Sequence, residues 1–238
     1  MQVGHLDGVW LDPLLHRALT VDRGTTLLDV STNWIRWHAD YERETPLRRR
    51  LELVQAHIAE MLRSTGNRRL SVLSVCAGDG RDLLGALAQQ SAGSRVRGRL
   101  VELNQTLAEK ARRTAREAFL TGIEVVVADA GISSAYVGAV PADLVLICGV
   151  FGNVVDADVE RTIRAIPMLC AEGATVIWTR HRRPPDLTTA IRQWFGEAGF
   201  VEVAFQTVPD SVATVGVERL ARRPESLEEG VRLFTIGG

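Results

Sequence analysis

The stretch LSVLSVCAGDGRD, residues 70–82, decides the fold of this chain. Its first six residues are mostly Leu and Val, which predicts a buried strand over residues 70–75. Gly78 and Gly80 then allow a tight turn and the close approach of a ligand, because glycine has no Cβ. We expect a helix over residues 81–90, whose free N–H groups face the turn and suit a nucleotide or an amino-acid carboxylate.

Beyond this stretch, short apolar runs alternate with helical patterns. The expected strands lie at residues 98–102, 123–127, 143–148 and 173–179, and the expected helices at 104–119, 157–170 and 186–198. This alternation predicts a doubly wound α/β fold, in which a parallel sheet has helices on both faces. Residues 200–208 and 211–220 read as strands joined by Pro209-Asp210, and they predict an antiparallel edge hairpin. Five parallel strands and this hairpin make a seven-stranded sheet.

The N-terminal part of the chain differs from the rest, because it lacks strand alternation. A helix is expected at residues 46–63, where Pro46 opens it and apolar residues recur on one face. We therefore divide the chain into an N-terminal helical cap, residues 1–65, and an α/β domain, residues 66–238.

An aromatic face is expected within this cap. Trp34, Trp37, His38 and Tyr41 recur at spacings of three and four, which places them on one side of a helix. Such a stripe is either ordinary core or the inner face of a lid over a ligand site, since aromatic rings hold cations and flat molecules. In the second case His38 and Tyr41 are the preferred contacts.

An acidic residue follows the second expected strand. Glu102 stands about 20 residues beyond Gly80, where a carboxylate can accept hydrogen bonds from both hydroxyls of a ribose. A nicotinamide dinucleotide site needs a third glycine three residues after Gly80, and Leu83 is found there. The pattern therefore favours another adenosine ligand over NAD.

With these features the chain resembles the class I S-adenosylmethionine (SAM)-dependent methyltransferases over about residues 70–220. CAGDG at residues 76–80 occupies the place of their glycine loop, and Glu102 that of their ribose-binding acid. VADA at 127–130 is similar to the element beside the adenine, and residues 143–151 are similar to the fourth strand and the loop beside the methyl group. The resemblance implies SAM as cofactor, with contacts from Cys76, Ala77, Gly78, Asp79, Gly80, Glu102, Leu103, Asn104, Asp129, Ala130, Cys148, Gly149 and Phe151.

The chain departs from the family pattern in the glycine loop. Cys76 replaces the first loop glycine, and Ser74 replaces the acid that often precedes it. A cysteine is tolerable at this position if its φ is negative, because its side chain is small.

Three of the implied contacts have a structural alternative. Asp129 either binds the adenine amino group or caps the N-terminus of a helix, a position that Asp favours. Phe151 either borders the ligand or packs in the core. We interpret Cys148 as a small core residue and not as a nucleophile.

A candidate proton acceptor for methyl transfer follows the fifth expected strand. His181 follows this strand at its carboxyl end, where ligands of open α/β sheets bind, and its pKa suits proton transfer at neutral pH. The alternative is a solvated basic loop before Pro184-Pro185. His38 is the other candidate base.

Composition narrows the class of function. A net charge of −1 disfavours a nucleic-acid surface, and no apolar run is long enough to span a membrane. The N-terminus lacks a secretory pattern, and the three cysteines have neither disulfide nor zinc spacing, so we expect a cytoplasmic protein without a metal site.

The expected function is methyl transfer from SAM to O, N or C of a small-molecule acceptor. Two alternatives share the fold: a non-catalytic module that binds SAM or another nucleotide, and another transferase such as an aminopropyl transferase. Titration with the cofactor distinguishes a module that does not bind it, and a screen of acceptors distinguishes the transferases. The oligomeric state has no signal in the sequence.

Overall fold

One seven-stranded sheet forms the centre of the computed structural model, which describes residues 45–90 and 95–236. The strand order is β3-β2-β1-β4-β5-β7-β6, and only the pairs that involve β7 are antiparallel. The predicted doubly wound sheet with its C-terminal hairpin is therefore confirmed. The strands are β1 (Leu70–Val75), β2 (Val96–Glu102), β3 (Ile123–Val127), β4 (Ala142–Ile147), β5 (Cys170–His181), β6 (Phe200–Thr207) and β7 (Ala213–Leu220).

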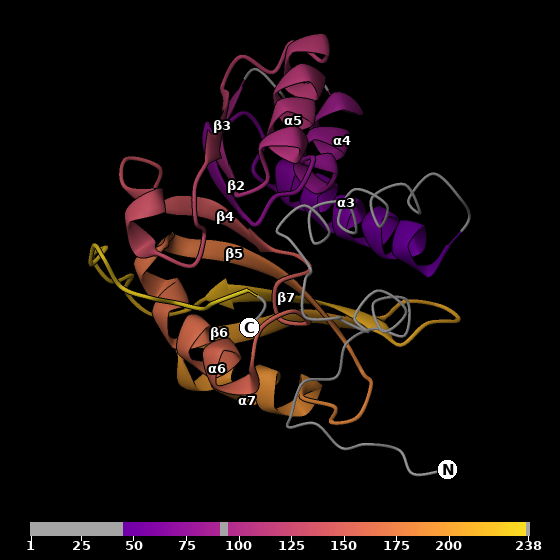
Figure 1. The fold of residues 1–238 in the computed structure, drawn as a ribbon, viewed down its shortest axis with the longest axis vertical. Helices are drawn as coiled ribbons and strands as arrows, with labels where there is room; N and C mark the ends of the chain where they lie inside the picture. The colour runs from indigo at the N-terminus through magenta and orange to yellow at the C-terminus, as the bar shows by residue number, and fades with distance from the viewer. Residues whose placement is uncertain (1–44, 91–94, 237–238) are drawn as a thin grey trace, which may run out of the picture.

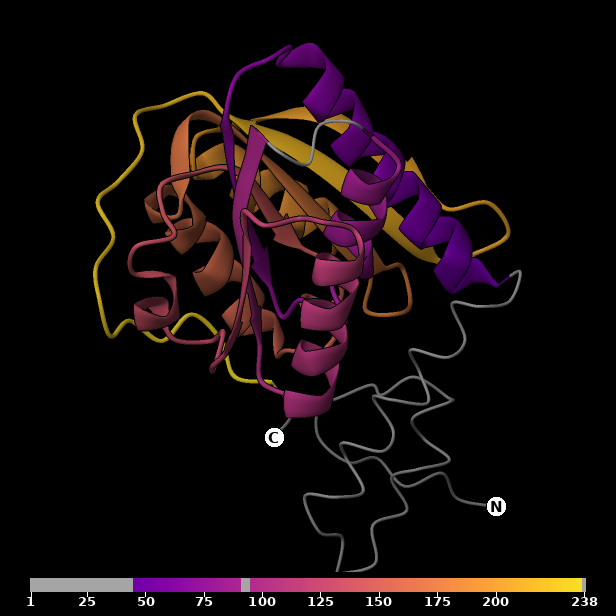
Figure 2. The same ribbon diagram turned by 90° about the horizontal axis from the view of Figure 1, so that it is seen from above.

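Helices cover both faces of this sheet (Figures 1 and 2). One face packs against α3 (Pro46–Ser64), α4 (Arg81–Ala88) and α5 (Gln105–Glu117), and the other against α6 (Asp156–Ala165) and α7 (Thr188–Glu197). The helices thus enclose two apolar layers, as a parallel sheet requires. All parallel strands end at the same edge of the sheet, where the loops after β1, β2 and β4 gather.

The largest difference from the predicted elements lies between α6 and β5. We expected one helix over residues 157–170, but α6 ends at Ala165 and a 3₁₀ turn, η4 (Ile166–Met168), follows. Pro167 lies in this turn, and it has no N–H with which to continue an α-helical ladder. The strand β5 then begins at Cys170, which pairs with Ala142 of β4.

Helix α3 belongs to the same core as the sheet. Thr45 caps its N-terminus, accepting a hydrogen bond from the N–H of Arg48. Val54, Ile58 and Leu62 recur at intervals of four and are buried against α4 and the sheet. The rest of the predicted cap, including Trp34, Trp37, His38 and Tyr41, lies outside the described residues.

The segment after β7 has no counterpart in the predicted elements. Figure 2 shows it in yellow along the side of the molecule opposite α3. Leu233 and Phe234 are buried, and the N–H of Thr235 donates to Asp158 of α6 at 2.9 Å. The chain therefore continues across the sheet to the loop after β3, where an isolated bridge joins Arg232 to Ile132.

Candidate cofactor site

The loop after β1 has the conformation that its glycines predict. Gly78 and Gly80 have φ values of +59° and +75°, in the left-handed region that favours glycine. A Cβ added to Gly80 would lie 2.6 Å from Leu100 Cδ2 and 2.8 Å from Leu84 Cδ1. The N–H of Ala77 donates to the carbonyl of Val101 in β2 at 2.9 Å, so the loop is held against the next strand.

Cys76 does not meet the condition that we set for a cysteine at this position. Its φ is +51°, whereas we took a cysteine to be tolerable here only with a negative φ. A left-handed conformation costs a non-glycine residue roughly 1–2 kcal/mol, and the hydrogen bond of Ala77 at the adjacent position maintains it. Burial raises the pKa of the Cys76 thiol far above its usual range, with smaller contributions from the charges of Glu102 and Asp129.

Glu102 connects the glycine loop to the end of β2. Its Oε2 accepts from the N–H of Gly78 at 2.7 Å, and its Oε1 accepts from the N–H of Asn104 at 2.8 Å. The side chain is buried, and burial raises the pKa of this carboxyl while the backbone donors oppose the rise. The carboxylate is therefore oriented at the carboxyl edge of the sheet, next to Gly78.

Asp79 points to two cations. Its carboxylate is buried and forms ion pairs with Arg81 and, at 2.9 Å, with Lys110 of α5. The side chain thereby joins the glycine loop to α4 and α5.

Leu103 and Asn104 follow Glu102 directly. Leu103 is 68% exposed at the carboxyl edge, which is unusual for a leucine and leaves an apolar surface beside Glu102. Asn104 caps α5, because its Oδ1 accepts from the N–H of Leu107 at 3.1 Å.

Asp129 is not a cap of an α-helix, which was the structural alternative. Its Oδ1 accepts from the N–H of Gly131 at 2.8 Å in a local turn, and a 3₁₀ turn, η3 (Ser133–Tyr136), starts only later. Its Oδ2 pairs at 2.7 Å with Arg232 from the C-terminal segment, a contact that the sequence analysis missed. Ala130 is buried, and its carbonyl accepts from the Tyr136 hydroxyl.

Two of the remaining predicted contacts, Gly149 and Phe151, lie in the loop after β4 and have different surroundings. Gly149 has a φ of +77°, and its N–H donates to Thr179 Oγ1 of β5 at 2.8 Å. Phe151 is fully buried between Trp178 and Phe195, with ring centroids 6.1 and 6.4 Å away, so its side chain packs in the core.

Cys148 precedes Gly149 at the end of β4. Burial raises the pKa of its thiol well above the usual range, and a hydrogen bond joins it to the Asp82 side chain. A thiol that resists ionisation fits our interpretation of Cys148 as a packing residue.

His181 ends β5 and lies beside the same loop. Its ring is half-buried, and its Nε2 is 3.8 Å from the position that a Cβ on Gly152 would take. Its Nδ1 accepts from the N–H of Arg183 at 3.3 Å, which favours the tautomer with the proton on Nε2. In this arrangement the nitrogen beside Gly152 is a hydrogen-bond donor, and Nδ1 must be released from Arg183 before it can accept a proton.

Three residues that sequence reasoning did not select also lie around the loop after β4. Arg180 is buried, donates to the carbonyl of Phe151, and holds this loop on β5. Arg50 of α3 and Asp82 of α4 lie near Gly149 and Cys148. Arg50 is 20 or more positions before the decisive stretch, and only its place on the buried side of an amphipathic helix sets it apart from Arg48 and Arg49.

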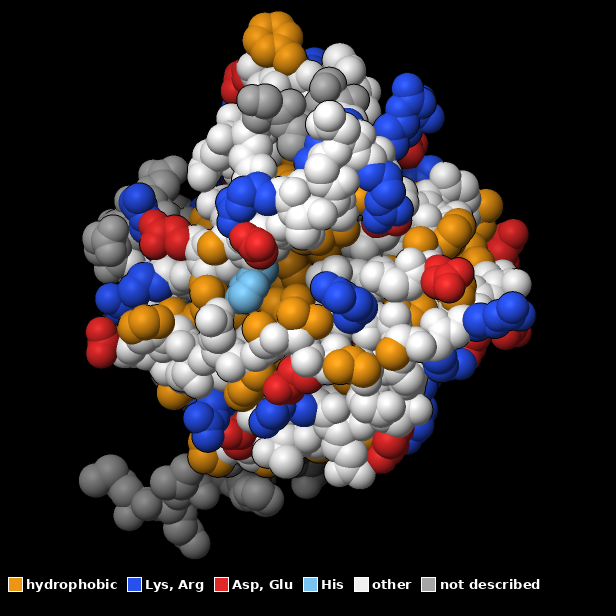
Figure 3. Space-filling model, turned by 180° about the vertical axis from the view of Figure 1, so that it is seen from behind, with side chains coloured by type: hydrophobic (Ala, Val, Ile, Leu, Met, Phe, Trp, Pro, Cys, Tyr) orange, Lys and Arg blue, Asp and Glu red, His pale blue; other side chains and the backbone are white. Residues whose placement is uncertain are grey.

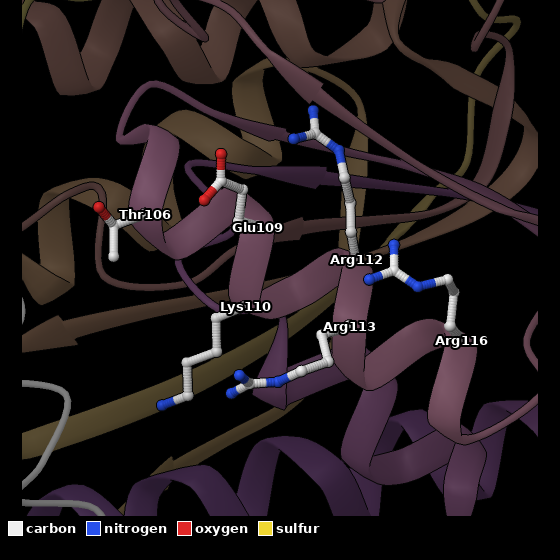
Figure 4. Close-up of a pocket in the computed structure, with 6 residues that line it drawn as sticks. All are labelled: Thr106, Glu109, Lys110, Arg112, Arg113 and Arg116. Carbon is white, nitrogen blue, oxygen red and sulfur yellow. The ribbon is translucent and has the colours of Figure 1, made fainter.

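A surface pocket of about 470 Å³ lies elsewhere, along α5. Figure 4 shows its lining side chains, which are Thr106, Glu109, Lys110, Arg112, Arg113 and Arg116. These six residues include none of the predicted contacts, and Arg112 and Lys110 are engaged by the Val125 carbonyl and by Asp79. We regard this pocket as a feature of a solvated helix face.

The charges on one face of the molecule are mixed. Figure 3 shows basic side chains interspersed with acidic ones around a hollow lined by hydrophobic side chains, and not a continuous basic face. Within residues 45–90 and 95–236, no helix is long and apolar enough to cross a membrane.

The arrangement was compared with known proteins. No family model and no curated protein matches the chain. Among solved structures, the magnesium protoporphyrin IX methyltransferase of Synechocystis PCC 6803 with bound SAM is similar, with a TM-score of 0.56 and 13% identity over 86% of this chain and 88% of that one. The precorrin-6y C5,15-methyltransferase of Geobacter metallireducens has a TM-score of 0.51 and 14% identity over 71% and 87% of the two chains.

A third similar structure has a different reaction in its name. The cyclase SpnF has a TM-score of 0.52 and 12% identity over 71% of this chain and 80% of its own. At such identities the likeness concerns the fold alone and leaves the reaction open. The chain has the fold of the class I SAM-dependent methyltransferases.

Proposed function

We propose that this protein is a SAM-dependent methyltransferase that acts on a small-molecule acceptor. The observation that carries the proposal is the 2.7 Å hydrogen bond from Gly78 N–H to Glu102, which unites the glycine loop and the predicted ribose-binding acid. This pair lies at the carboxyl edge, where β1 and β4 are neighbours and the strand order reverses. Ligands of doubly wound sheets bind at this point.

The residues present fit an adenosine ligand. Each oxygen of Glu102 accepts one backbone N–H, and a carboxylate has about four lone-pair sites, so acceptor capacity remains for two ribose hydroxyls. Exposed Leu103 offers an apolar surface beside it for a flat base. Gly78 keeps the backbone of the loop open to close approach, and Gly80 leaves room for the side chains of Leu84 and Leu100.

When bound, SAM supplies an electrophilic methyl group on a sulfonium. The protein's part is then to hold an acceptor in line with this group and to exclude water. His181 is the described residue placed to take a proton from a hydroxyl or ammonium acceptor, once its Nδ1 is free of Arg183. His38 and Tyr41 keep the roles expected from the sequence.

A small acceptor is supported by the mixed charge of the face shown in Figure 3, since nucleic-acid enzymes present a basic face. Oxygen, nitrogen and carbon acceptors all remain within the proposal. A non-catalytic module of the same fold is the second candidate, favoured by Cys76, whose side chain occupies the place of a loop glycine.

The test is calorimetric titration with SAM and S-adenosylhomocysteine, with NAD as the control ligand. We expect micromolar binding of the first two and none of NAD. If neither SAM nor S-adenosylhomocysteine binds, the proposal is contradicted. Binding without S-adenosylhomocysteine production across a panel of hydroxyl, amine and carbon acceptors would favour the non-catalytic module.

A further inference from the structure

The segment after β7 ends in a strap that belongs to the folded core. Residues 228–235, which we call the C-terminal strap, lie beyond residues 70–220, the part of the chain that resembles the methyltransferases. Leu233 and Phe234 of the strap are 1% exposed, and they pack in the same apolar layer as Tyr136. The strap is therefore a part of the core that lies outside the seven strands of the sheet.

The strap is bonded to the loop after β3. The carbonyl of Val231 accepts from the N–H of Ser133 at 3.0 Å, and the N–H of Leu233 donates to the carbonyl of Gly131 at 2.8 Å. The Ser133 hydroxyl donates to the carbonyl of Glu228 at 2.6 Å and accepts from the N–H of Val231 at 2.9 Å. Ser133 is fully buried, so its hydroxyl is the central anchor of the strap on this loop.

The strap also fits closely against Gly131 and Asp129. A Cβ added to Gly131 would lie 2.2 Å from the carbonyl oxygen of Phe234 and 2.9 Å from Arg232 Nη1. Arg232 Nη1 is 2.7 Å from Asp129 Oδ2, while the N–H of Gly131 donates to Oδ1 of the same carboxylate. Each oxygen of Asp129 therefore has a donor that holds it, although the side chain is 46% exposed.

The end of the strap is bonded to α6. The N–H of Thr235 donates to Asp158 Oδ2 at 2.9 Å, and the carbonyl of Leu233 accepts from Thr162 Oγ1 and Arg161 Nε, both at 3.1 Å. Asp158 is buried and lies in the first turn of α6. The strap thus connects the loop after β3 with a helix of the core, which fixes its own position.

The loop after β3 needs such support because β3 is an edge strand. β3 has one neighbour in the sheet, β2, and on that side the N–H of Ala128 donates to the carbonyl of Glu102 at 3.2 Å. The strap supplies hydrogen bonds that a second neighbouring strand would give, and the antiparallel bridge between Ile132 and Arg232 is one of these places. Released from the strap, the backbone groups of this loop can bond to water in more than one conformation.

We infer that the C-terminal strap is a positioning element of the candidate cofactor site: it holds the loop after β3 in one conformation through Ser133 and orients Asp129 through Arg232. The inference rests on the proposed function, because this loop carries the element that is similar to the adenine border of a SAM site. A protein whose loop has the binding conformation only part of the time has a proportionally weaker apparent affinity. Disrupting the strap should therefore weaken cofactor binding, although no strap residue is among the predicted contacts.

The first experiment measures the affinity of the full chain for S-adenosylhomocysteine by titration calorimetry. Ser133→Ala removes both hydroxyl bonds to the strap, and we expect the affinity to fall by about 10-fold, since each buried hydrogen bond contributes several-fold. Ser134→Ala is the matched control, because the neighbouring hydroxyl accepts a single exposed bond, from the N–H of Gly230 at 3.0 Å. Its affinity should stay within about twofold of the wild type. The unfolding midpoint of each variant is recorded, and the titrations are made well below it.

The second experiment separates orientation of Asp129 from packing of the strap. It compares S-adenosylhomocysteine with S-inosylhomocysteine, whose base has a carbonyl in place of the amino group and should bind more weakly. Arg232→Gln should lower the preference for the adenine ligand by about threefold, the effect of an exposed ion pair, and Arg232→Lys should recover most of it because it keeps the charge. Arg223→Gln, at an exposed arginine before the strap, should leave the preference unchanged.

The results that overturn the inference differ from those that overturn the proposed function. A folded Ser133→Ala with an affinity within twofold of the wild type, or equal losses for both ligands in Arg232→Gln, would overturn the positioning role and leave the proposed function standing. If Ser133→Ala does not fold, the Arg232 variants decide alone. Absence of S-adenosylhomocysteine binding by the wild type would overturn the proposed function and the inference with it.

Discussion

Glu102 and Glu218 are buried glutamates in the same sheet, and their surroundings differ. Glu102 lies at the carboxyl end of β2, where two backbone N–H groups donate to its oxygens at 2.7 and 2.8 Å. Glu218 is in β7 and 2% exposed, and among the described residues one side chain donates a hydrogen bond to it, Trp178 through Nε1 at 3.2 Å. Its cross-strand neighbour is Glu202, which Arg192 already engages.

The difference teaches where a sheet can keep a carboxylate ionised. At the end of a strand, the N–H groups of the following loop are free to donate hydrogen bonds to a side chain. Within the sheet, the backbone N–H groups already donate to the neighbouring strands. Burial raises the pKa of both glutamates, but backbone donors oppose the rise at Glu102. For Glu218, burial raises the pKa to about 7, the Trp178 bond lowers it and the charge of Glu202 raises it. The environment of Glu102 favours a carboxylate that accepts hydrogen bonds from a ligand, and that of Glu218 favours the protonated carboxyl.

The largest effect is expected at Glu102. Glu102→Gln keeps the shape but removes the charge and turns an NH₂ group toward one backbone donor. We expect the affinity for S-adenosylhomocysteine to fall by about 100-fold, since charged hydrogen bonds contribute about 1.5–3 kcal/mol each. Titration calorimetry measures it, with exposed Glu117→Gln as the control. An affinity within a factor of three of the wild type would remove Glu102 from the site.

Glu218 should respond in the opposite sense, as a gain of stability. Its folded pKa of about 7 lies above its ordinary value of 4.5, so the protonated form favours folding below pH 4.5 and this contribution is lost as the pH rises through 7. The Gln side chain of Glu218→Gln cannot ionise. As the pH rises from 5 to 8, the free energy of unfolding of this variant should therefore increase by about 2 kcal/mol relative to that of the wild type, a value already reduced for solvent screening.

Urea unfolding of both proteins at pH 5 and pH 8 measures this gain. Glu117→Gln again serves as the control, and it should show the pH dependence of the wild type. An equal stability difference between Glu218→Gln and the wild type at both pH values would show that Glu218 stays ionised in the fold.

A smaller effect is expected beside Glu102, at Cys76. Cys76→Gly removes a Cβ from a residue with φ of +51° and should stabilise the protein by about 1 kcal/mol. Cys148→Gly is the matched control, because Cys148 has no positive φ and glycine should destabilise it. Chemical unfolding compares the two variants. If both are destabilised alike, the loop beside Glu102 is not strained.

The smallest effect is expected at Asp129, whose carboxylate is exposed, unlike those of Glu102 and Glu218. Its side chain is 46% exposed and pairs with Arg232, which is 43% exposed. Asp129→Asn should change the free energy of unfolding by no more than about 0.5 kcal/mol, because exposed ion pairs contribute little. We expect S-adenosylhomocysteine affinity to fall only a few-fold. A loss as large as that of Glu102→Gln would rank the two acids equally in the site.

Much of the fold could be predicted because its signals are local. The strand over residues 70–75 was expected with the bounds it has, since a run of Leu and Val between turn residues defines it. The hairpin of β6 and β7 followed from two apolar runs around Pro209-Asp210. The boundary between α6 and β5 was misplaced, because the apolar residues around Pro167 fit a buried helix as well as a buried turn.

The candidate site was predictable only where the chain itself brings residues together. Gly78, Gly80 and Glu102 follow neighbouring parallel strands, so their meeting at one edge depends on the strand pattern. Phe151 has no such constraint. Its side chain could face the edge or the core, and contact with Trp178 and Phe195 decided for the core.

The sequence by itself determined the seven-stranded α/β sheet, the glycine turn and the acid beside it, because periodicity and glycine conformation act over a few residues. Tertiary structure alone decided three further features: the left-handed backbone of Cys76, the contact of Arg232 with Asp129, and the placement of Arg50 beside Gly149. Each depends on packing between segments far apart in the chain. No local sequence pattern predicts which residues such packing buries or which charged side chains it brings together.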